Sequence, residues 1–459
     1  MHLHSHIGLP YHVSVLVQVL RISPLIMLRE KVEFYRERVK TLHTISDEDE
    51  KNFARSERVS PFLQTLALVA TCRNVKSFFD AFAQILDNIG FYSHSDPKQK
   101  LPDGFIHPVM VYLSEVLISC MPGKIFAKFL SEHVLLVPSS KTHVCEKRSS
   151  SSLARKIVAH KVGSRIFRAI VRRIRKSQDL NSILTSLCDA TDTSSRSSAL
   201  SRVLTKGQHA VLNELATKCS QSDFSEMQRL FSKMLYGALG HDGSKPHSSG
   251  NEDLLIRAVV SLTKCSDLET QCNSLSVSDD PFTQPVCLPG CLLAQTLFSF
   301  QTYRPTVLAA SLCTQSSNRL HSWSKHPMLS RVLEAAFSSE VVPVKRKKQL
   351  FSLLEPHLVD LSCDRYGSRL VELLWTSMDC MDDSESMKEH LANHLLASRS
   401  QLSSDRFGHF VNRKLQLDLL ANSPALWKKR MLHSFDSKKR TKSVDDSGPL
   451  THVRKRIKQ

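Results

Sequence analysis

Short amphipathic stretches recur along this chain and predict helices. In each stretch the apolar residues return at spacings of three and four, which places them on one side of a helix. Two clear sets are Leu370, Val371, Leu373 and Leu374, and Val332, Leu333, Ala336 and Phe337. These side chains are expected to form a core between packed helices.

The stretches share a frame that repeats about every forty residues. DRYGSRLVELLW (364–375) and DRFGHFVNRKL (405–415) both begin with Asp-Arg-aromatic-Gly. Upstream copies follow at intervals of 38 to 44 residues, apart from one interval of 83 that fits two periods. A degenerate unit at 252–262 fills that interval, and weaker candidates lie around Val111 and Ser60. In five copies a glycine is followed by Ser164, Gln208, Cys291, Ser368 or His409. In the sixth copy Ser330 takes the same position, although the residue before it is not glycine.

A helical repeat of this length predicts an all-α solenoid, because each unit must bury its apolar face against its neighbours. The expected fold is a curved superhelix of three-helix units of about 40 residues. A glycine count of only 14 in 459 residues also favours helices over sheet-rich folds.

Two residue types mark the start of the recurring helix. Asp364 and Asp405 precede it and are expected to cap its N-terminus. A glycine is expected at its first turn, where the missing side chain lets a neighbouring helix or a ligand approach closely. These glycines are Gly163, Gly207, Gly290, Gly367 and Gly408.

The chain is expected to divide into three parts. Residues 1–55 are an N-terminal segment of unassigned structure, 56–430 form the repeat array, and 431–459 form a basic disordered tail. Within the array, polar stretches at 146–156, 240–253 and 266–280 are expected to be loops between units.

The charge of the chain points to an anionic partner. It holds 62 Lys and Arg against 44 Asp and Glu, a net charge of +18. Residues 428–459 alone hold 11 Lys and Arg and 3 Asp. The clusters KKRTK (438–442) and RKRIK (454–458) favour recognition by nuclear import receptors and general attraction to RNA.

Three variable positions of the recurring helix are expected to share an exposed face. They are the first, second and fifth residues after the glycine, which are neighbours on a helix surface. The candidate RNA-contacting residues at these positions are Ser164, Arg165 and Arg168; Gln208 and His209; Gln295; Ser330, Arg331 and Glu334; Ser368, Arg369 and Glu372; and His409, Phe410 and Arg413.

The chemistry of these positions suits a polynucleotide. The middle residue of the best triplets is flat, and guanidinium or aromatic planes stack on unpaired bases. Glu334 and Glu372 offer carboxylates that match the two N–H donors on the Watson–Crick edge of guanine. For any single triplet, an ion pair on a solvated helix surface explains the residues equally well. Recurrence in one register favours a single long ligand.

The frame resembles the second helix of Pumilio-type RNA-binding repeats, in which the equivalent three positions read one base. The resemblance is clearest over 155–430, fainter over 56–150 and absent before that. It implies that Ser330 with Glu334, and Ser368 with Glu372, prefer guanine, with Arg331 and Arg369 as stacking planes.

Other triplets depart from the base-reading pattern of this family. The triplets around Arg165 and Phe410 would suit phosphate contact or a looser code. Leu212, Cys291 and Leu292 cannot read a base edge, so their units are expected to serve the scaffold.

Within the superfamily, the order of units, the repeated motif pair and the basic tail look most like the ribosome-biogenesis members. That likeness implies a monomer in the nucleus and nucleolus that binds precursor ribosomal RNA and small-subunit pre-ribosomal particles. It also implies support of small-subunit rRNA maturation without catalysis. The N-terminal repeats of that group are not recognisable in this sequence.

Other classes of function find less support. A protein-binding solenoid of the HEAT or armadillo kind has a similar period, but it does not need a flat side chain after the glycine in each unit. No phosphate loop, His-Glu-x-x-His or Gly-x-Ser-x-Gly motif is present, so no catalytic residue, cofactor or metal is expected. The 12 Cys are scattered singly and predict reduced thiols. Arg21 and Pro24 interrupt the apolar stretch 11–28, so no membrane segment is expected.

Overall fold

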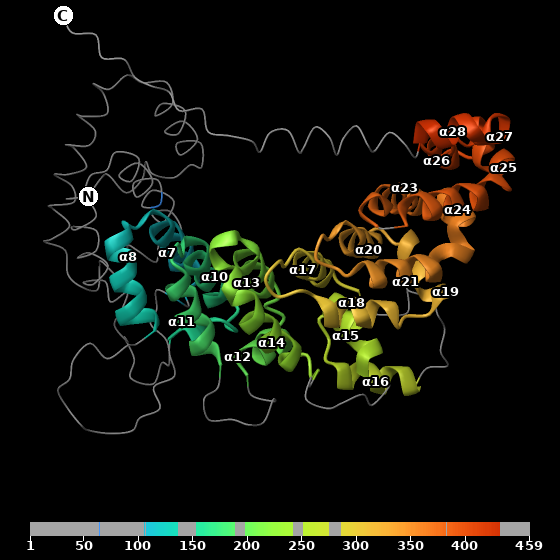
Figure 1. The fold of residues 1–459 in the computed structure, drawn as a ribbon. Coiled ribbons are helices and arrows are strands. Elements are labelled where there is room, and N and C mark those ends of the chain that lie inside the picture. The colour runs from blue at the N-terminus through green and yellow to red at the C-terminus, as the bar shows by residue number, and fades with distance from the viewer. Residues whose placement is uncertain are drawn as a thin grey trace, which may run out of the picture. The chain divides into compact units, whose positions relative to one another are not determined.

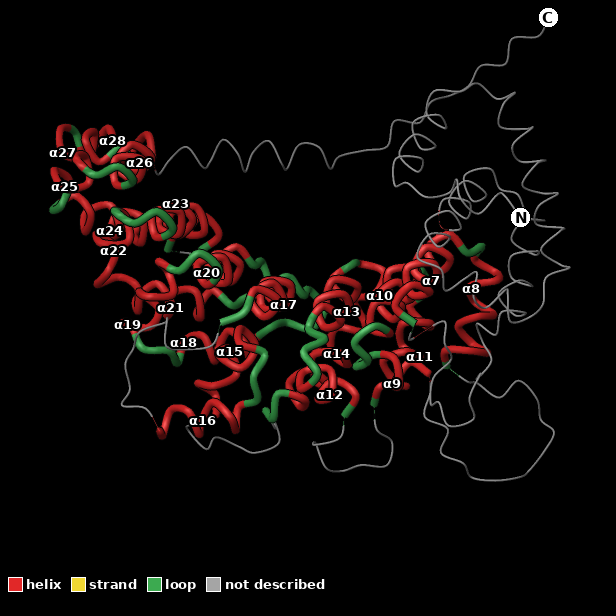
Figure 2. Tube along the Cα trace, turned by 180° about the vertical axis from the view of Figure 1, so that it is seen from behind, coloured by secondary structure: helices red, strands yellow, loops and turns green. Residues whose placement is uncertain are grey.

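The computed structural model describes residues 107–135, 153–188, 198–241, 251–274, 286–381 and 383–431, together with Gln64 and Phe105. The regular elements in these ranges are helices, and no strand occurs among them (Figures 1 and 2). The expectations about residues 1–55, the candidate unit around Ser60 and the tail from residue 432 onward lie outside the described residues.

The chain forms two compact units. The first unit contains α7 (Pro108–Cys120), α8 (Gly123–Phe129), the π-helix η1 (Leu130–Val134), α9 (Leu153–Ile157), α10 (Gly163–Arg173), α11 (Ser177–Leu187), α12 (Ala199–Thr205), α13 (Ala210–Ser220), the 3₁₀ helix η2 (Ser222–Met227), α14 (Gln228–Ala238) and most of α16 (Cys265–Ser274). Here α7 packs on α10, and α10 packs on α13.

The second unit holds α15 (Asn251–Ser261) apart from its first residue, and the helices from α17 onward. Its other elements are α17 (Leu288–Phe298), α18 (Thr306–Cys313), α19 (Ser317–Lys325), α20 (Leu329–Ser338), α21 (Val344–Leu354), η4 (Glu355–His357), α22 (Leu358–Ser362), α23 (Gly367–Ser377), η5 (Met378–Cys380), α24 (Ser384–Leu396), α25 (Arg399–Ser404), α26 (Gly408–Leu415), α27 (Leu417–Asn422) and α28 (Pro424–Met431).

The second unit is a stack of three-helix repeats. Successive repeats are α18 to α20, α21 to α23 and α24 to α26. The last helix of each repeat packs on the last helix of the next, so α17, α20, α23 and α26 form one row (Figure 1). The first helices of the repeats also pack on their successors: α18 packs on α21, and α24 packs on α27. The predicted all-α repeat fold is confirmed.

The amphipathic pattern identified most of the core of this row correctly. On α20 the four predicted residues are at most 1% exposed, and on α23 Leu370, Val371 and Leu374 are equally buried. Leu373 is half-buried, because it lies at the margin of the apolar face. Helix α15 coincides with the degenerate unit expected at 252–262.

The expected close approach at glycine is confirmed for Gly290, Gly367 and Gly408. A Cβ on Gly367 would lie 2.6 Å from the carbonyl oxygen of Leu361, in the preceding helix of the same repeat. The prediction for Gly207 is wrong. Helix α13 begins only at Ala210, and Gly207 adopts a left-handed backbone, with φ of 67°, just after α12.

All three expected loops contain some helix, and the first residues of α15, from Asn251, lie inside the 240–253 stretch. Helix α16 runs from Cys265 to Ser274, inside much of the 266–280 stretch, because Cys265 and Leu268 anchor this polar helix in the core. Helix α9 begins at Leu153, inside the 146–156 stretch, and buries Leu153, Ala154 and Ile157.

None of the described helices has the length and apolar character needed to cross a membrane. Across the same residues, no group of three or more His, Cys, Asp or Glu side chains is placed to hold a metal ion. The cysteines whose side chains the structure describes are free thiols.

Candidate nucleic-acid interface

Aspartate caps fix the start of two helices in the row. The Oδ1 atom of Asp364 accepts hydrogen bonds from the backbone N–H groups of Tyr366 and Gly367, both at 2.8 Å. Asp405 does the same for Phe407 at 2.7 Å and Gly408 at 2.8 Å. These N–H donors hold the pKa of Asp405 below its ordinary value, because they stabilise the charged carboxylate. The predicted caps are confirmed.

Histidine takes the same place in two other repeats. The Nδ1 atom of His326 accepts from the N–H groups of Met328 and Leu329, both at 3.2 Å. His160 accepts from Gly163 at 3.0 Å. An Nδ1 that accepts a hydrogen bond carries no proton, and burial lowers the pKa of both imidazoles. Sequence reasoning missed these caps because histidine is not a usual N-cap residue.

The second unit presents flat side chains from consecutive helices of one row. Arg331 of α20, Arg369 of α23 and Phe410 of α26 occupy the same position in the frame, and all three are exposed. Phe410 exposes 52% of its surface, which is unusual for a phenylalanine. Because the three helices pack in sequence, these planes follow one another along one face.

The serines at the first position of three triplets are not exposed as expected, whereas His409 at the same position of α26 is exposed. Ser164, Ser330 and Ser368 are buried, at 4%, 0% and 6% exposure. In these three helices the serine points toward the packed side, since it lies one turn before other core positions. The Ser330 hydroxyl has no hydrogen-bond partner within the described part of the chain.

The two candidate glutamates of the second unit, Glu334 and Glu372, are half-buried and already paired. Glu334 Oε2 lies 2.6 Å from Nη1 of Arg331, three residues earlier on α20. Glu372 Oε2 lies 3.5 Å from Nζ of Lys414 on the neighbouring α26. The ion pair expected as the simpler explanation is therefore present on α20. A base that used either carboxylate would displace these cations.

Helices α26 and α17 differ from the Ser-Arg-Glu pattern. On α26 the His409 and Phe410 rings lie 3.9 Å apart, and Arg413 is exposed close to them in the helix. On α17 Cys291 is buried, Leu292 is 45% exposed, and Gln295 is half-buried with its Nε2 donating to the Cys291 carbonyl.

The first unit brings an arginine onto a tyrosine. The guanidinium carbon of Arg165 lies 4.4 Å from the centre of the Tyr112 ring, and Nη2 of Arg165 lies 3.0 Å from Oε2 of Glu115. Tyr112 and Glu115 occupy the second and fifth positions of a frame that starts at Val111. Sequence reasoning placed a weak unit there but did not select these two residues.

The remaining candidate RNA-contacting residues of the first unit lie near α13. Arg168 of α10 faces Glu214 of α13, with Nε and Oε2 separated by 3.6 Å. Gln208 and His209 are half-buried and precede α13 rather than lying within it. Gln208 Oε1 accepts a hydrogen bond from the Ser164 hydroxyl at 2.8 Å, so this pair joins two repeats.

Comparison with known proteins identifies the repeat type. Residues 105–410 match the family described as the NOP9-like PUF repeat domain. A protein named Nucleolar protein 9 from Arthroderma benhamiae is 25% identical over 81% of this chain and 46% of its own length. The protein of that name from Arthroderma gypseum is 23% identical over 84% of this chain and 50% of its own. The chain thus spans about half the length of these curated relatives.

Pumilio homolog 23 of Arabidopsis thaliana is 30% identical over 31% of this chain and 18% of its own length. The solved structure of APUM23-GGAGUUGACGG shares the fold, with a TM-score of 0.59 and 19% identity over 85% of this chain and 65% of that chain. The resemblance to Pumilio-type repeats is confirmed. Because the family match covers more than half of its residues, this chain belongs to the NOP9-like PUF repeat family.

Proposed function

We propose that this chain is a non-catalytic RNA-binding protein of the nucleus and nucleolus that binds precursor ribosomal RNA. Membership of a PUF repeat family supports RNA binding, and the names of the relatives support a nucleolar place of action. The observation that carries the proposal is the series of exposed flat side chains formed by Arg331, Arg369 and Phe410 on consecutive helices.

The finer assignments belong to the same proposal. The protein supports small-subunit rRNA maturation as a monomer within small-subunit pre-ribosomal particles. Its basic tail engages nuclear import receptors. Glu334 and Glu372 bind guanine edges after they release Arg331 and Lys414. Breaking these two ion pairs costs little stability, because both pairs lie at the surface. The buried serines make a smaller contribution to base reading than these carboxylates.

The test compares two double variants of the full chain. Arg331→Ala with Arg369→Ala removes two stacking planes, each worth about 1–3 kcal/mol per base. We expect affinity for a pool of random 20-nucleotide RNAs, measured by fluorescence anisotropy, to fall at least about tenfold. The control, Lys345→Ala with Arg430→Ala, removes the same charge from exposed positions on α21 and α28.

Equal affinities for the two double variants would remove the proposed interface. A protein-binding solenoid of the HEAT or armadillo kind predicts that result. Thermal melting of both variants should match that of the unaltered chain, because all four side chains are solvent-exposed.

A further inference from the structure

Three arginines form a row along one side of α10. Arg165, Arg168 and Arg172 are separated by three and four residues, so their side chains lie above one another on the helix surface. Their side chains are 42%, 31% and 47% exposed, which leaves each guanidinium partly open to solvent. We call these three residues the arginine row.

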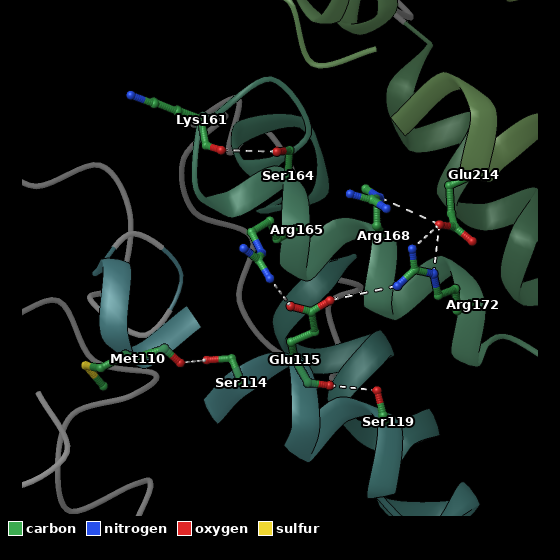
Figure 3. Close-up of polar contacts among 10 residues, drawn as sticks. All are labelled: Met110, Ser114, Glu115, Ser119, Lys161, Ser164, Arg165, Arg168, Arg172 and Glu214. Carbon is green, nitrogen blue, oxygen red and sulfur yellow. Dashed lines mark hydrogen bonds and ion pairs between the residues drawn. The ribbon is translucent and has the colours of Figure 1, made fainter. Parts of the chain in front are cut away.

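One glutamate lies on each flank of the arginine row. From α7, Glu115 contacts Arg165 at 3.0 Å and Arg172 at 3.8 Å. From α13, Glu214 contacts Arg172 at 2.7 Å and Arg168 at 3.6 Å. Figure 3 shows Glu115 between Arg165 and Arg172, with Arg168 and Arg172 turned toward Glu214. Three positive charges thus share two negative charges.

The electrostatics of Arg165 agree with this geometry. Burial by itself lowers the pKa of the guanidinium, but the hydrogen bond and charge of Glu115 outweigh that effect and raise the pKa overall. The arginine row suits planar or tetrahedral oxyanions, because guanidinium groups bind them through paired N–H donors.

Base reading is not available here as it is on α20 and α23. The first position, Ser164, is as buried as Ser330 and Ser368, so it does not distinguish the α10 triplet from those on α20 and α23. The fifth position is Arg168 rather than a carboxylate. Three guanidinium groups in line on one helix surface fit successive backbone phosphates better than base edges.

We infer that the arginine row binds RNA phosphates, and that Glu115 and Glu214 weaken this contact by occupying the same guanidinium groups. This inference rests on the proposed RNA-binding function and adds a regulating element to it. A phosphate replaces a glutamate at little cost in free energy, since partly exposed ion pairs are weak and screened by salt. The two glutamates are positioning residues that set how strongly this unit holds RNA of any sequence.

The experiment uses the full chain and two fluorescein-labelled probes, a uridine 20-mer and an adenosine 20-mer. Glu115→Gln and Glu214→Gln are measured singly across a series of salt concentrations, with Glu226→Gln as the control. Glu226 is an exposed carboxylate of η2 that makes none of the contacts with the arginine row described above. The control carries the same change in net charge.

We expect Glu115→Gln and Glu214→Gln each to tighten binding of both probes about three- to tenfold at low salt. The slope of log affinity against log salt should steepen by about 0.7 for each additional RNA phosphate that the arginine row neutralises. The ratio of affinities for the two probes should stay constant, because phosphates carry no base identity. Adding Arg172→Gln to Glu115→Gln should abolish the increase in affinity.

Affinities no tighter than that of Glu226→Gln would overturn the inference while leaving RNA binding intact. Absence of salt-dependent binding by the unaltered chain would instead overturn the proposed function. If Glu115→Gln lowers the melting temperature, Glu214→Gln and the single variant Arg172→Gln decide the matter. Arg172→Gln should make the salt slope shallower by about 0.7.

Discussion

At the residue scale, the position three before the recurring helix determines how that helix begins. Asp364 and Asp405 accept two N–H groups each, and His326 and His160 accept through Nδ1 at the equivalent place. The aspartates could be predicted because they are strong capping residues. The histidines could not, since their role depends on which ring nitrogen faces the helix.

The histidine caps make stability depend on pH. The pKa of His326 is lowered in the folded chain, so the unfolded chain binds more protons as the pH falls below about 7. Stability is fully present above the ordinary histidine pKa and is lost as the pH falls through the folded value. We expect His326→Asp to reduce the drop in melting temperature between pH 7.5 and 5.5, because a carboxylate keeps accepting over that range.

The comparison variant is His326→Ala, which lacks an acceptor at every pH. It should melt below the unaltered chain at pH 7.5, with a cost of about 0.5–2 kcal/mol. An identical pH dependence for His326→Asp and the unaltered chain would show that this cap does not titrate. His160 remains in both variants, so a residual pH effect is expected.

At the element scale, a glycine near the start of α17, α23 and α26 lets that helix pack closely on an earlier helix, whereas Leu329 takes this place in α20. Periodicity alone located α15, α20, α23 and α26, because each has a full apolar face. It misplaced α13, since Gly207 ends the preceding helix in a left-handed conformation instead of opening a new one. The contacts between Arg172 and the two glutamates join residues more than forty positions apart and could not be predicted from local spacing.

Replacing Gly290 should push α17 away from α15. A Cβ at this position would lie 2.5 Å from the carbonyl oxygens of both Val259 and Val260, which are backbone atoms and cannot swing away. Gly290→Ala should therefore lower stability by about 1–3 kcal/mol. The matched variant is Gly237→Ala on α14, where nothing lies within 4 Å of the added atom.

Gly237→Ala should leave stability unchanged or raise it by up to about 1 kcal/mol, because alanine favours helix. Thermal melting by circular dichroism distinguishes the two variants. Equal melting temperatures would mean that the α17 backbone moves aside without strain.

At the scale of the whole molecule, the basic segment after α28 and the buried Trp427 of α28 are expected to contribute to different properties: the first to RNA binding and the second to stability. The net charge of +18 and the basic segment after α28 were evident from the sequence. The role of Trp427 in the last described helices was not evident, because it depends on the contacts of one side chain. Trp427 of α28 is fully buried, packs edge-on against Trp375 at 6.1 Å and donates its Nε1–H to the Leu415 carbonyl at 2.7 Å.

Two truncations separate these contributions. A chain ending at Met431 keeps Trp427 and should melt like the full chain, but it should bind RNA more weakly and with a shallower salt dependence. A chain ending at Ser423 loses Trp427 and should melt several degrees lower, since removing a buried tryptophan costs about 3–5 kcal/mol. Melting and RNA titration of both chains check this, and a fall in melting temperature for the longer truncated chain would contradict it.

The glycine contacts have a consequence for descent. Gly367 packs against the backbone carbonyl of Leu361, and Gly408 packs against that of Leu402. Each of these two glycines therefore contacts its own repeat rather than the neighbouring one. A copied or deleted unit therefore carries its internal fit with it. Substitutions at the solvent-exposed positions of one repeat then leave the internal packing of every repeat intact. Repeat number can therefore increase first, and the exposed residues can diverge afterwards.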